Sequence, residues 1–297
     1  MPGRIARILV CCMALFTPAC AVSAAETVQE GVSGIAWTIL AAGLDLAEIP
    51  LAVHGAQTAK PEAGGEPAAE AQGQSSVLAL RIDPAGYEFT LHMASEEQAQ
   101  LTMPALAKQH GLVAAVNASM YLPDNKTSTG YLRSATHINN PRIAEKFGAF
   151  FVAGPRKPGL PPARLVDRGA ENWQQALDDY ALVLQNYRLS NAQGKALWAP
   201  EAPAHSIAAL SQDSSGHILF LLCSRPLPPV VFTAAVLRLP LRIRAMMYLE
   251  GGPQAALLVR AGSADGVWTG RRGIWSGNPD AGLPNVLGVR PRAGAPQ

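Results

Sequence analysis

Three apolar segments of this chain end abruptly in side chains that can bind ligands or take part in reactions. Their sequences are AAVNASMY, ALVLQNYR and MMYLEGGP, and a fourth segment, HSIAAL, begins with polar residues instead. Strand ends that meet at one rim of a sheet commonly form a ligand site. We therefore predict one pocket that is lined by polar side chains from all four segments: Asn117, Gln185, Arg188, His205 and Glu250.

Each of these residues also has a structural explanation. Asn117 fits an ordinary turn, Arg188 a surface charge and His205 a structural hydrogen-bonding group. The Gly-Gly-Pro sequence after Glu250 fits a turn with positive φ that ends a strand. The chain holds no comparable set of polar strand ends elsewhere. A turn accounts for the glycines but does not require the glutamate, so we favour a site with Glu250 at its centre.

Strands must position these side chains, because strand-like segments outnumber helical ones. Beside the two strands that flank Glu250, the pattern predicts strands at 33–40, 77–83, 87–93, 112–121, 148–154, 181–189, 205–210, 217–224 and 283–290. Helices are predicted at 102–111, at 171–180 and after Thr233. The short sequences PAG and SQDSSG fit tight connections between neighbouring strands. We therefore predict an α+β fold, a single domain with mixed, largely antiparallel sheets and a few covering helices.

The first 24 residues have the layout of a secretory signal peptide. Arg4 and Arg7 precede an apolar run at 8–16, and the Val-Ser-Ala sequence that ends at residue 24 fits a cleavage site. The run is too short for a permanent transmembrane helix. We expect an exported chain, periplasmic or secreted, with no transmembrane segment after cleavage. Cys20 follows Thr-Pro-Ala and loosely resembles a lipoprotein acceptor, so lipid anchoring is the alternative.

The full sequence has the composition of a globular protein. Hydrophobic residues make up 48% and charged residues 15% of the sequence, which argues against disorder. Cleavage lowers the number of Lys and Arg from 24 to 22, equal to the 22 Asp and Glu, and this balance argues against nucleic acid as a partner. We place the domain at 33–290, with a disordered loop at 55–76 that is rich in Ala, Gly, Pro, Glu and Gln.

The order of these segments resembles the phosphodiester glycosidase domain family. The resemblance runs from about residue 33 to residue 289, through VLALRIDPAGYEFTLHMASEE, LAKQHGLVAAVNASMY, GAFFV, LVLQNYRLS, HSIAAL and YLEGGPQAALLV. Its most specific pieces are the sequences at 117–121 and 250–252. This chain has Glu-Gly-Gly-Pro-Gln where family members usually carry Asp-Gly-Gly-Gly-Ser, and it has His205 where an arginine is usual.

The resemblance implies hydrolysis of a sugar phosphodiester or a related envelope glycan linkage. Glu250 would then act as base or nucleophile. His205 would carry protons, because an unperturbed imidazole titrates near neutrality. Arg188 or Arg133 would grip the phosphate, since a guanidinium binds its oxygens bidentately. The substrate-binding residues expected in full are Asn117, Arg133, Gln185, Arg188, Gly251 and Gly252.

The sequence shows neither the usual pair of glycosidase carboxylates nor a metal motif. Asp124 is the only other acid next to a motif, and no spacing of His, Cys or Asp predicts a metal centre. We therefore expect a carbohydrate or sugar-phosphate partner and no cofactor, with a bound divalent cation left open. The alternative function is a non-catalytic protein for glycan binding or envelope assembly on the same fold.

Mass spectrometry of the mature N-terminus distinguishes the two modes of export. Because the Val-Ser-Ala sequence fits a signal-peptidase site, we expect a free N-terminus near Ala25. An acylated Cys20 at the N-terminus would contradict this prediction and would establish lipid anchoring.

Overall fold

The computed structural model describes residues 28–30, 34–53, 75–272 and 275–294. The predicted signal peptide, Cys20 and most of the predicted loop at 55–76 lie outside these residues. Ser75 and Ser76, which the sequence pattern places in that loop, instead begin strand β4. Within the described part of the chain, no helix is long and apolar enough to cross a membrane.

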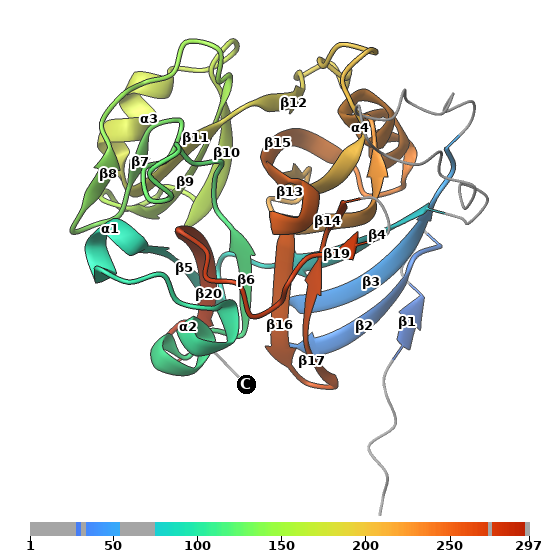
Figure 1. Cartoon of the computed structure of the whole chain (residues 1–297), viewed down its shortest axis with the longest axis horizontal. Coiled ribbons are helices and arrows are strands. Elements are labelled where there is room, and N and C mark those ends of the chain that lie inside the picture. The colour runs from blue at the N-terminus through green and yellow to red at the C-terminus, as the bar shows by residue number, and fades with distance from the viewer. Residues whose placement is uncertain (1–27, 31–33, 54–74, 273–274, 295–297) are drawn as a thin grey trace, which may run out of the picture.

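Eight strands form the largest sheet, in which all neighbours run antiparallel (Figure 1). In sheet order they are β1 (Val28–Glu30), β2 (Ala36–Ala41), β3 (Leu44–Leu51), β4 (Ser75–Ile82), β14 (Ile218–Leu227), β13 (His205–Asp213), β15 (Ile243–Gly251) and β12 (Arg188–Ser190). The central strands β13 and β14 are buried along most of their length, as expected for strands that are covered on both faces.

Two five-stranded sheets complete the architecture. One has the order β10 (Ala163–Asp167), β9 (Ala149–Pro155), β11 (Tyr180–Asn186), β7 (Leu132–Arg133) and β8 (Ile138–Asn140). The other has the order β17 (Ala264–Thr269), β16 (Ala256–Ala261), β6 (Ala114–Asn117), β20 (Asn285–Pro291) and β5 (Tyr87–Met93). A small ribbon pairs β18 (Arg271–Arg272) with β19 (Trp275–Ser276).

These sheets confirm the predicted α+β class with largely antiparallel sheets. All strand pairs in the two five-stranded sheets are antiparallel, like those of the largest sheet. The parallel pairs that a mixed sheet would include are therefore not found among the strands that the structure describes.

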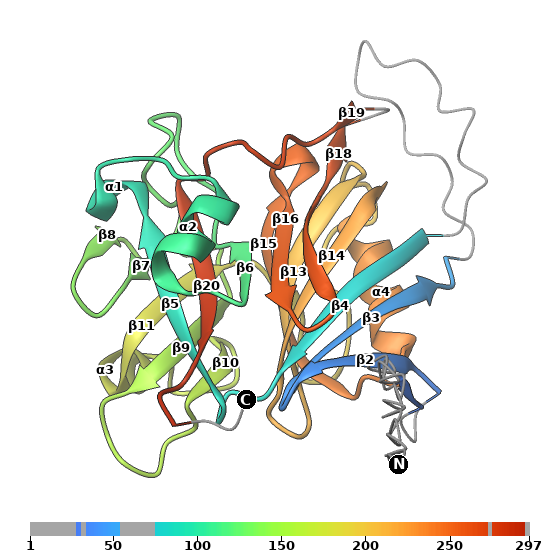
Figure 2. The ribbon, with the colours of Figure 1, turned by 90° about the horizontal axis from the view of Figure 1, so that it is seen from below.

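Among the four α-helices in the described residues, three each cover the outer face of one sheet. The helices are α1 (Ala94–Glu97), α2 (Met103–His110), α3 (Trp173–Asp179) and α4 (Pro229–Arg238), and a 3₁₀ turn, η1, spans Gly252–Gln254. Figure 2 shows α2 across β6 and β20, where it buries apolar side chains against that sheet. Similarly, α3 packs on β9 and β11, and α4 packs on the eight-stranded sheet.

The helix boundaries follow from local signals. The α2 helix begins and ends as predicted, because the Thr102 hydroxyl accepts a hydrogen bond from the N–H of Ala105 at 3.2 Å and Gly111 takes a left-handed backbone with φ of +64°. The α4 helix begins earlier than predicted. Pro229 suits a first turn, where its missing N–H costs no hydrogen bond, and the Thr233 hydroxyl donates to the Pro229 carbonyl inside the helix instead of capping it.

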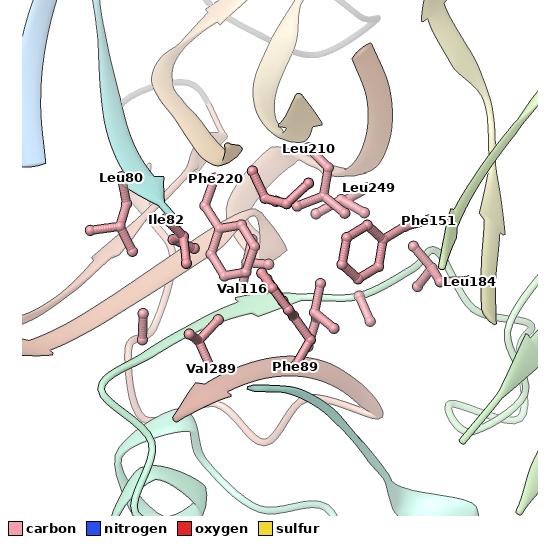
Figure 3. Packing of buried hydrophobic residues seen from close by; sticks show 14 of the residues in the cluster. Leu80, Ile82, Phe89, Val116, Phe151, Leu184, Leu210, Phe220, Leu249 and Val289 are labelled. Atoms are coloured by element: carbon pink, nitrogen blue, oxygen red, sulfur yellow. The ribbon is translucent and has the colours of Figure 1, made fainter. Parts of the chain in front are cut away.

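The inner faces of the three sheets share one hydrophobic core (Figure 3). Phe89 of β5 lies at the junction, with its ring centroid 5.2 Å from Phe151 of β9 and 6.3 Å from Phe220 of β14, both in edge-on geometry. Truncating a buried phenylalanine typically costs about 3–5 kcal/mol. This junction therefore fixes how the three sheets meet.

Two connections that read as tight turns in the sequence link different sheets. The PAG sequence at 84–86 leads from β4 in the eight-stranded sheet to β5 in a five-stranded one. The Gly-Gly-Pro sequence after Glu250 leads from β15 to β16, which also belong to different sheets. The glycines after Glu250 therefore do not close a hairpin. They carry the chain from one sheet to another, and Glu250 stands at that crossing.

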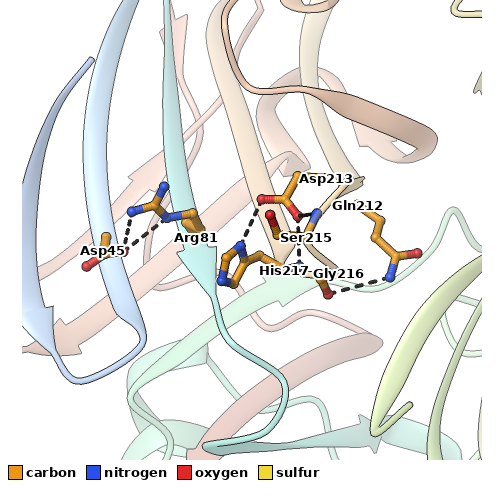
Figure 4. A network of polar contacts seen from close by, with 7 residues as sticks. All are labelled: Asp45, Arg81, Gln212, Asp213, Ser215, Gly216 and His217. Carbon is orange, nitrogen blue, oxygen red and sulfur yellow. Dashed lines mark hydrogen bonds and ion pairs between the residues drawn. The ribbon is translucent and has the colours of Figure 1, made fainter. Parts of the chain in front are cut away.

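The hairpin between β13 and β14 is present, and Asp213 holds its turn (Figure 4). Asp213 Oδ1 accepts hydrogen bonds from the N–H groups of Ser215 at 2.8 Å and His217 at 2.9 Å, and its Oδ2 lies 2.8 Å from His217 Nδ1. The hydrogen bond with Asp213 raises the pKa of His217. Burial alone would raise the pKa of Asp213, but the hydrogen bonds from His217 outweigh it and the pKa is lowered.

Replacing His217 with Asn is expected to lower the free energy of unfolding mainly at mildly acidic pH. The folded-state pKa of His217 lies above the ordinary 6.5, so the stability from its charge is fully present below pH 6.5 and is lost as pH rises through the folded-state value. The partner Asp213 has a lowered pKa, so its own contribution is lost only at more acidic pH. Urea unfolding at about pH 5.5 and about pH 8.5 measures the difference. An equal loss at both values would contradict this prediction.

Candidate active site

Glu250 stands where β15 leaves the eight-stranded sheet. Its backbone pairs with Ala208 on β13, and a β-bulge offsets it from Tyr248, which pairs with Ala209. Its Oε1 accepts a hydrogen bond from the N–H of Gly251 at 2.9 Å. Bulges redirect side chains and are common next to functional sites. The strand therefore presents Glu250 at the crossing between sheets rather than in the core.

The surroundings of Glu250 favour its neutral form. Burial raises the pKa of its carboxyl to about 7, and the hydrogen bond from Gly251 offsets this only in part. Burial and then the nearby charge of Glu250 raise the pKa of the Tyr121 and Tyr248 phenols. Glu250 therefore titrates near neutral pH, as catalytic acids and bases do.

Gly251 permits close packing beside Glu250. A Cβ atom at position 251 would lie 2.2 Å from Tyr248 Oη and 2.6 Å from His205 Cδ2. The rings of His205 and Tyr248 meet edge-on with centroids 6.1 Å apart. The glycine thus makes room for a histidine and a tyrosine next to the carboxyl. Gly252 has a different role, because its φ of +66° suits glycine while the space around it is open.

Two later glycines pack directly on the turn that follows Glu250. A Cβ atom on Gly270 would lie 2.0 Å from the carbonyl oxygen of Gly252, and one on Gly277 would lie 2.0 Å from that of Pro253. The N–H of Gly270 also donates to the Ala255 carbonyl at 2.6 Å. The turn is therefore held by backbone-to-backbone contacts.

Asn117 lies at the end of β6, beside the chain that leaves Glu250. Its Oδ1 accepts a hydrogen bond from the N–H of Ala256 at 3.0 Å. Its Nδ2 is buried, as is the Ser119 hydroxyl, and neither has a hydrogen-bond partner among the described residues. Because buried polar groups are nearly always hydrogen-bonded, these two atoms are suited to a ligand oxygen or a water molecule.

Arg188 lines a cleft with a volume of about 410 Å³. The other lining residues are Lys146, Gly148, Tyr187, Leu197 and Trp198. Arg188 pairs through Nη1 with Asp167, while its Nε is buried without a partner in the described structure. Two cations and two aromatic rings suit an anionic ligand that also has an apolar face.

Aromatic rings connect this cleft to Glu250. The ring centroids of Tyr187 and Trp198 are 5.2 Å apart, and Trp198 lies at the same distance from Tyr248. The N–H of Tyr248 donates to the Tyr187 carbonyl at 2.9 Å. Tyr248 in turn lies against His205 and stands two residues before Glu250, so packed aromatic rings join the wall of the cleft to the surroundings of Glu250.

The side chains of Arg133 and Gln185 are engaged in structural contacts. Arg133 Nη2 donates to the carbonyls of Leu177 and Tyr180 at the end of α3, both at 2.6 Å. Gln185 is fully buried, and its amide donates to and accepts from backbone groups of the loop that begins at Ala144. The structure thus places His205 beside Gly251 and Tyr248, next to Glu250, and it places Asn117 against Ala256 on the following strand. Arg133 and Gln185 are engaged in other parts of the fold.

Sequence reasoning missed several residues around this site, among them Lys146, Trp198 and Tyr121. Lys146 and Trp198 line the cleft from loops without a strand pattern. Tyr121 closes the Asn-Ala-Ser-Met-Tyr motif, and after burial the nearby charge of Glu250 raises the pKa of its phenol. Trp198 could have been found from its place in the loop that follows Arg188, because an aromatic ring near a polar strand end often lines a ligand site.

Gly251→Ala is expected to disturb the packing of the site more than Gly252→Ala. A methyl group at 251 must displace Tyr248 or His205, whereas at 252 it meets open space and costs about 1–2 kcal/mol for the left-handed backbone. Near-ultraviolet circular dichroism reports the tyrosine environment, and urea unfolding reports stability. We expect a changed near-ultraviolet spectrum only for Gly251→Ala. Identical spectra for both variants would show that Gly251 does not hold the site open.

The comparisons with known proteins agree with this fold. Residues 110–290, more than half of the chain, match the family model NAGPA, phosphodiester glycosidase. The zebrafish N-acetylglucosamine-1-phosphodiester α-N-acetylglucosaminidase catalytic domain, auto-inhibited by its pro-peptide, is similar with a TM-score of 0.54 and 9% identity over 84% of each chain. A hypothetical protein from Synechocystis is similar with a TM-score of 0.54 and 12% identity over 86% of this chain and 63% of its own. No curated protein sequence matches. The structural likenesses show the fold, and the family match shows that this chain belongs to the phosphodiester glycosidase family.

Proposed function

We propose that this chain is an exported hydrolase that cleaves the bond between the anomeric carbon of a sugar and a phosphodiester oxygen. The observation that carries the proposal is Glu250, whose buried carboxyl has a pKa of about 7 and connects through aromatic rings to a cationic cleft. Family membership and the activity named for the zebrafish relative support a sugar-1-phosphodiester as the substrate class. The signal-peptide pattern supports export.

The chemistry of the leaving group explains why one carboxylate suffices. Cleavage at the anomeric carbon releases a phosphate monoester, which departs as a stable anion, so the leaving oxygen needs no general acid. Glu250 either takes a proton from a water molecule that attacks the anomeric carbon, or attacks that carbon itself before water releases the sugar. In both cases the carbon–oxygen bond to phosphate breaks, and the phosphate leaves with the electron pair.

The cleft offers separate groups for the two halves of such a substrate. Arg188 and Lys146 can hold the phosphate oxygens, and the Arg188 Nε provides a buried donor for one of them. The rings of Tyr187 and Trp198 offer an apolar surface for the sugar ring. His205 beside Tyr248 supplies a group that can pass protons to or from solvent.

The pKa of Glu250 sets the expected pH dependence. A base or nucleophile must be ionised, so the rate should rise with pH through about 7 and then level off. The same shift lowers stability as pH rises. The folded-state pKa lies above the ordinary 4.5, so the stabilising neutral form is fully present below pH 4.5 and is lost as pH passes through about 7.

Glu250→Gln is expected to lower kcat on a sugar-1-phosphodiester by about 100-fold or more, because removal of a general base typically costs that much. The experiment measures hydrolysis of a panel of sugar-1-phosphodiesters and envelope glycans across pH. Glu48→Gln is the matched control, since Glu48 is an exposed glutamate on β3 of the same sheet. It should leave the rate and its pH profile unchanged.

Thermal unfolding separates loss of catalysis from loss of fold. Glu250→Gln should unfold at a higher temperature than the wild type near pH 8, where it removes a buried charge, and at a similar temperature near pH 4, where Glu250 is protonated. Equal turnover by the wild type and Glu250→Gln would contradict the role of Glu250 as base or nucleophile. Glycan binding without turnover, retained in Glu250→Ala, would instead establish the non-catalytic binding function.

A further inference from the structure

Two histidines and one glutamate converge at one end of β5, outside the candidate active site. His92 comes from β5, Glu97 is the last residue of α1 and His110 is the last residue of α2. His92 Nδ1 lies 3.0 Å from Glu97 Oε1, and His110 Nε2 lies 3.5 Å from the same oxygen. One ligand atom from each residue lies within 4.8 Å of the other two.

These separations fit a shared ion. Tetrahedral zinc with bonds of about 2.0–2.1 Å places its ligand atoms about 3.3 Å from one another. Both distances to Glu97 Oε1 are close to that value, so a small shift of the His110 ring would complete the geometry. The His92 side chain is 8% exposed, whereas Glu97 and His110 are 20% and 28% exposed, so the cluster has a buried side and an open side. The open side gives an ion a path of entry and a position for water.

The second ring nitrogen of His92 already has a partner. Its Nε2 lies 3.0 Å from the Thr90 hydroxyl on the same strand. Histidines that bind metals usually have the other ring nitrogen fixed in this way, which orients the ring and selects the tautomer. Thr90 therefore leaves Nδ1 of His92 to face Glu97.

Hydrogen bonding accounts fully for the pair of His217 and Asp213, but it does not account for the cluster of three residues. His217 and Asp213 meet at 2.8 Å as a simple pair at a turn. In the cluster, one carboxylate oxygen faces two imidazoles whose ring centroids are only 4.1 Å apart. His110 Nε2 is buried, and its 3.5 Å separation from Glu97 is too long for a good hydrogen bond, so no hydrogen-bond partner is found for it in the described structure.

The surrounding charges are compatible with a cation. His110 is the last residue of α2, where the carbonyl end of the helix carries partial negative charge. Arg290 on the neighbouring strand β20 is paired with Glu88, with a separation of 2.8 Å between Nε and Oε2. The nearest strand neighbours of His92 therefore do not add an unpaired positive charge.

We propose that His92, Glu97 and His110 bind one divalent transition-metal ion of the zinc type. Two imidazoles and a carboxylate are a ligand set that Zn²⁺ takes in proteins, with water in the fourth position, whereas Mg²⁺ and Ca²⁺ prefer oxygen ligands. The ion would tie α1 and α2 to β5. His92 pairs with Val286, which pairs with Asn117, so the ion would stiffen the same row of the sheet in which Asn117 lies.

The experiment titrates Zn²⁺ into the full chain after removal of metals by a chelator and of any histidine tag. Isothermal titration calorimetry should give one site per chain, and the unfolding temperature should rise with Zn²⁺ because binding favours the folded state. His110→Ala and Glu97→Gln should each weaken Zn²⁺ binding at least about tenfold, since even the partners of metal ligands matter that much. Mg²⁺ should give no comparable shift.

His217→Ala is the matched control, because it also removes a partly exposed histidine that is paired with a carboxylate. It should retain the Zn²⁺ affinity and the Zn²⁺-dependent rise in unfolding temperature. Two results would overturn the proposal: no saturable Zn²⁺ binding by the wild type, or equal binding by the wild type, His110→Ala and Glu97→Gln. Far-ultraviolet circular dichroism of each variant confirms that it is folded, and Co²⁺ absorption bands typical of tetrahedral coordination provide a readout independent of stability.

Discussion

The inner faces of three sheets must be buried against one another, and Phe89 stands where they meet. Because a strand can belong to only one sheet, the chain has to change sheet through short connections at the border of this core. The connection between β4 and β5 is one of them, and the Gly-Gly-Pro turn between β15 and β16 is another. Polar strand ends gather at such borders because the backbone leaves its ladder there. Asn117 at the end of β6 therefore meets Ala256, at the start of the strand that follows the turn after Glu250.

Glu250 shows how position changes the properties of an ordinary side chain. A glutamate on an exposed strand titrates well below neutral pH. At the crossing, burial removes water from its carboxyl, while the hydrogen bond that its Oε1 accepts comes from the N–H of the next residue, Gly251. The fold thus tolerates a carboxyl whose loss of hydration is offset only in part by hydrogen bonding. Strained or poorly solvated groups of this kind persist where the surrounding structure is rigid, which here is the bulged pairing of β13 and β15.

The sequence predicts best what depends on near neighbours. Thr102 and Gly111 define α2 because a helix cap and a left-handed glycine act within a few residues. Asn117, Gln185, Arg188, His205 and Glu250 were predicted as one site because each stands near the end of a strand segment. Pairing partners were harder to predict, since the same PAG turn serves a hairpin or a change of sheet. Gln185 shows a second limit: only the folded chain reveals that backbone groups already satisfy its amide. The cluster of His92, Glu97 and His110 spans a strand and two helices, so no regular spacing marks it.

Gly270 and Gly277 pack so closely on the turn after Glu250 that neither position can hold a side chain. No methyl group fits between the backbone of the turn and the backbone at Gly270 and Gly277. A change in the length of the turn therefore requires a matching change in the backbone at these two glycines. Insertions or exchanged loops from relatives would therefore fail if only one of the two segments were transplanted. Changes to the site therefore require the turn to be redesigned together with Gly270 and Gly277, whereas single substitutions suit the cleft around Trp198 and Lys146.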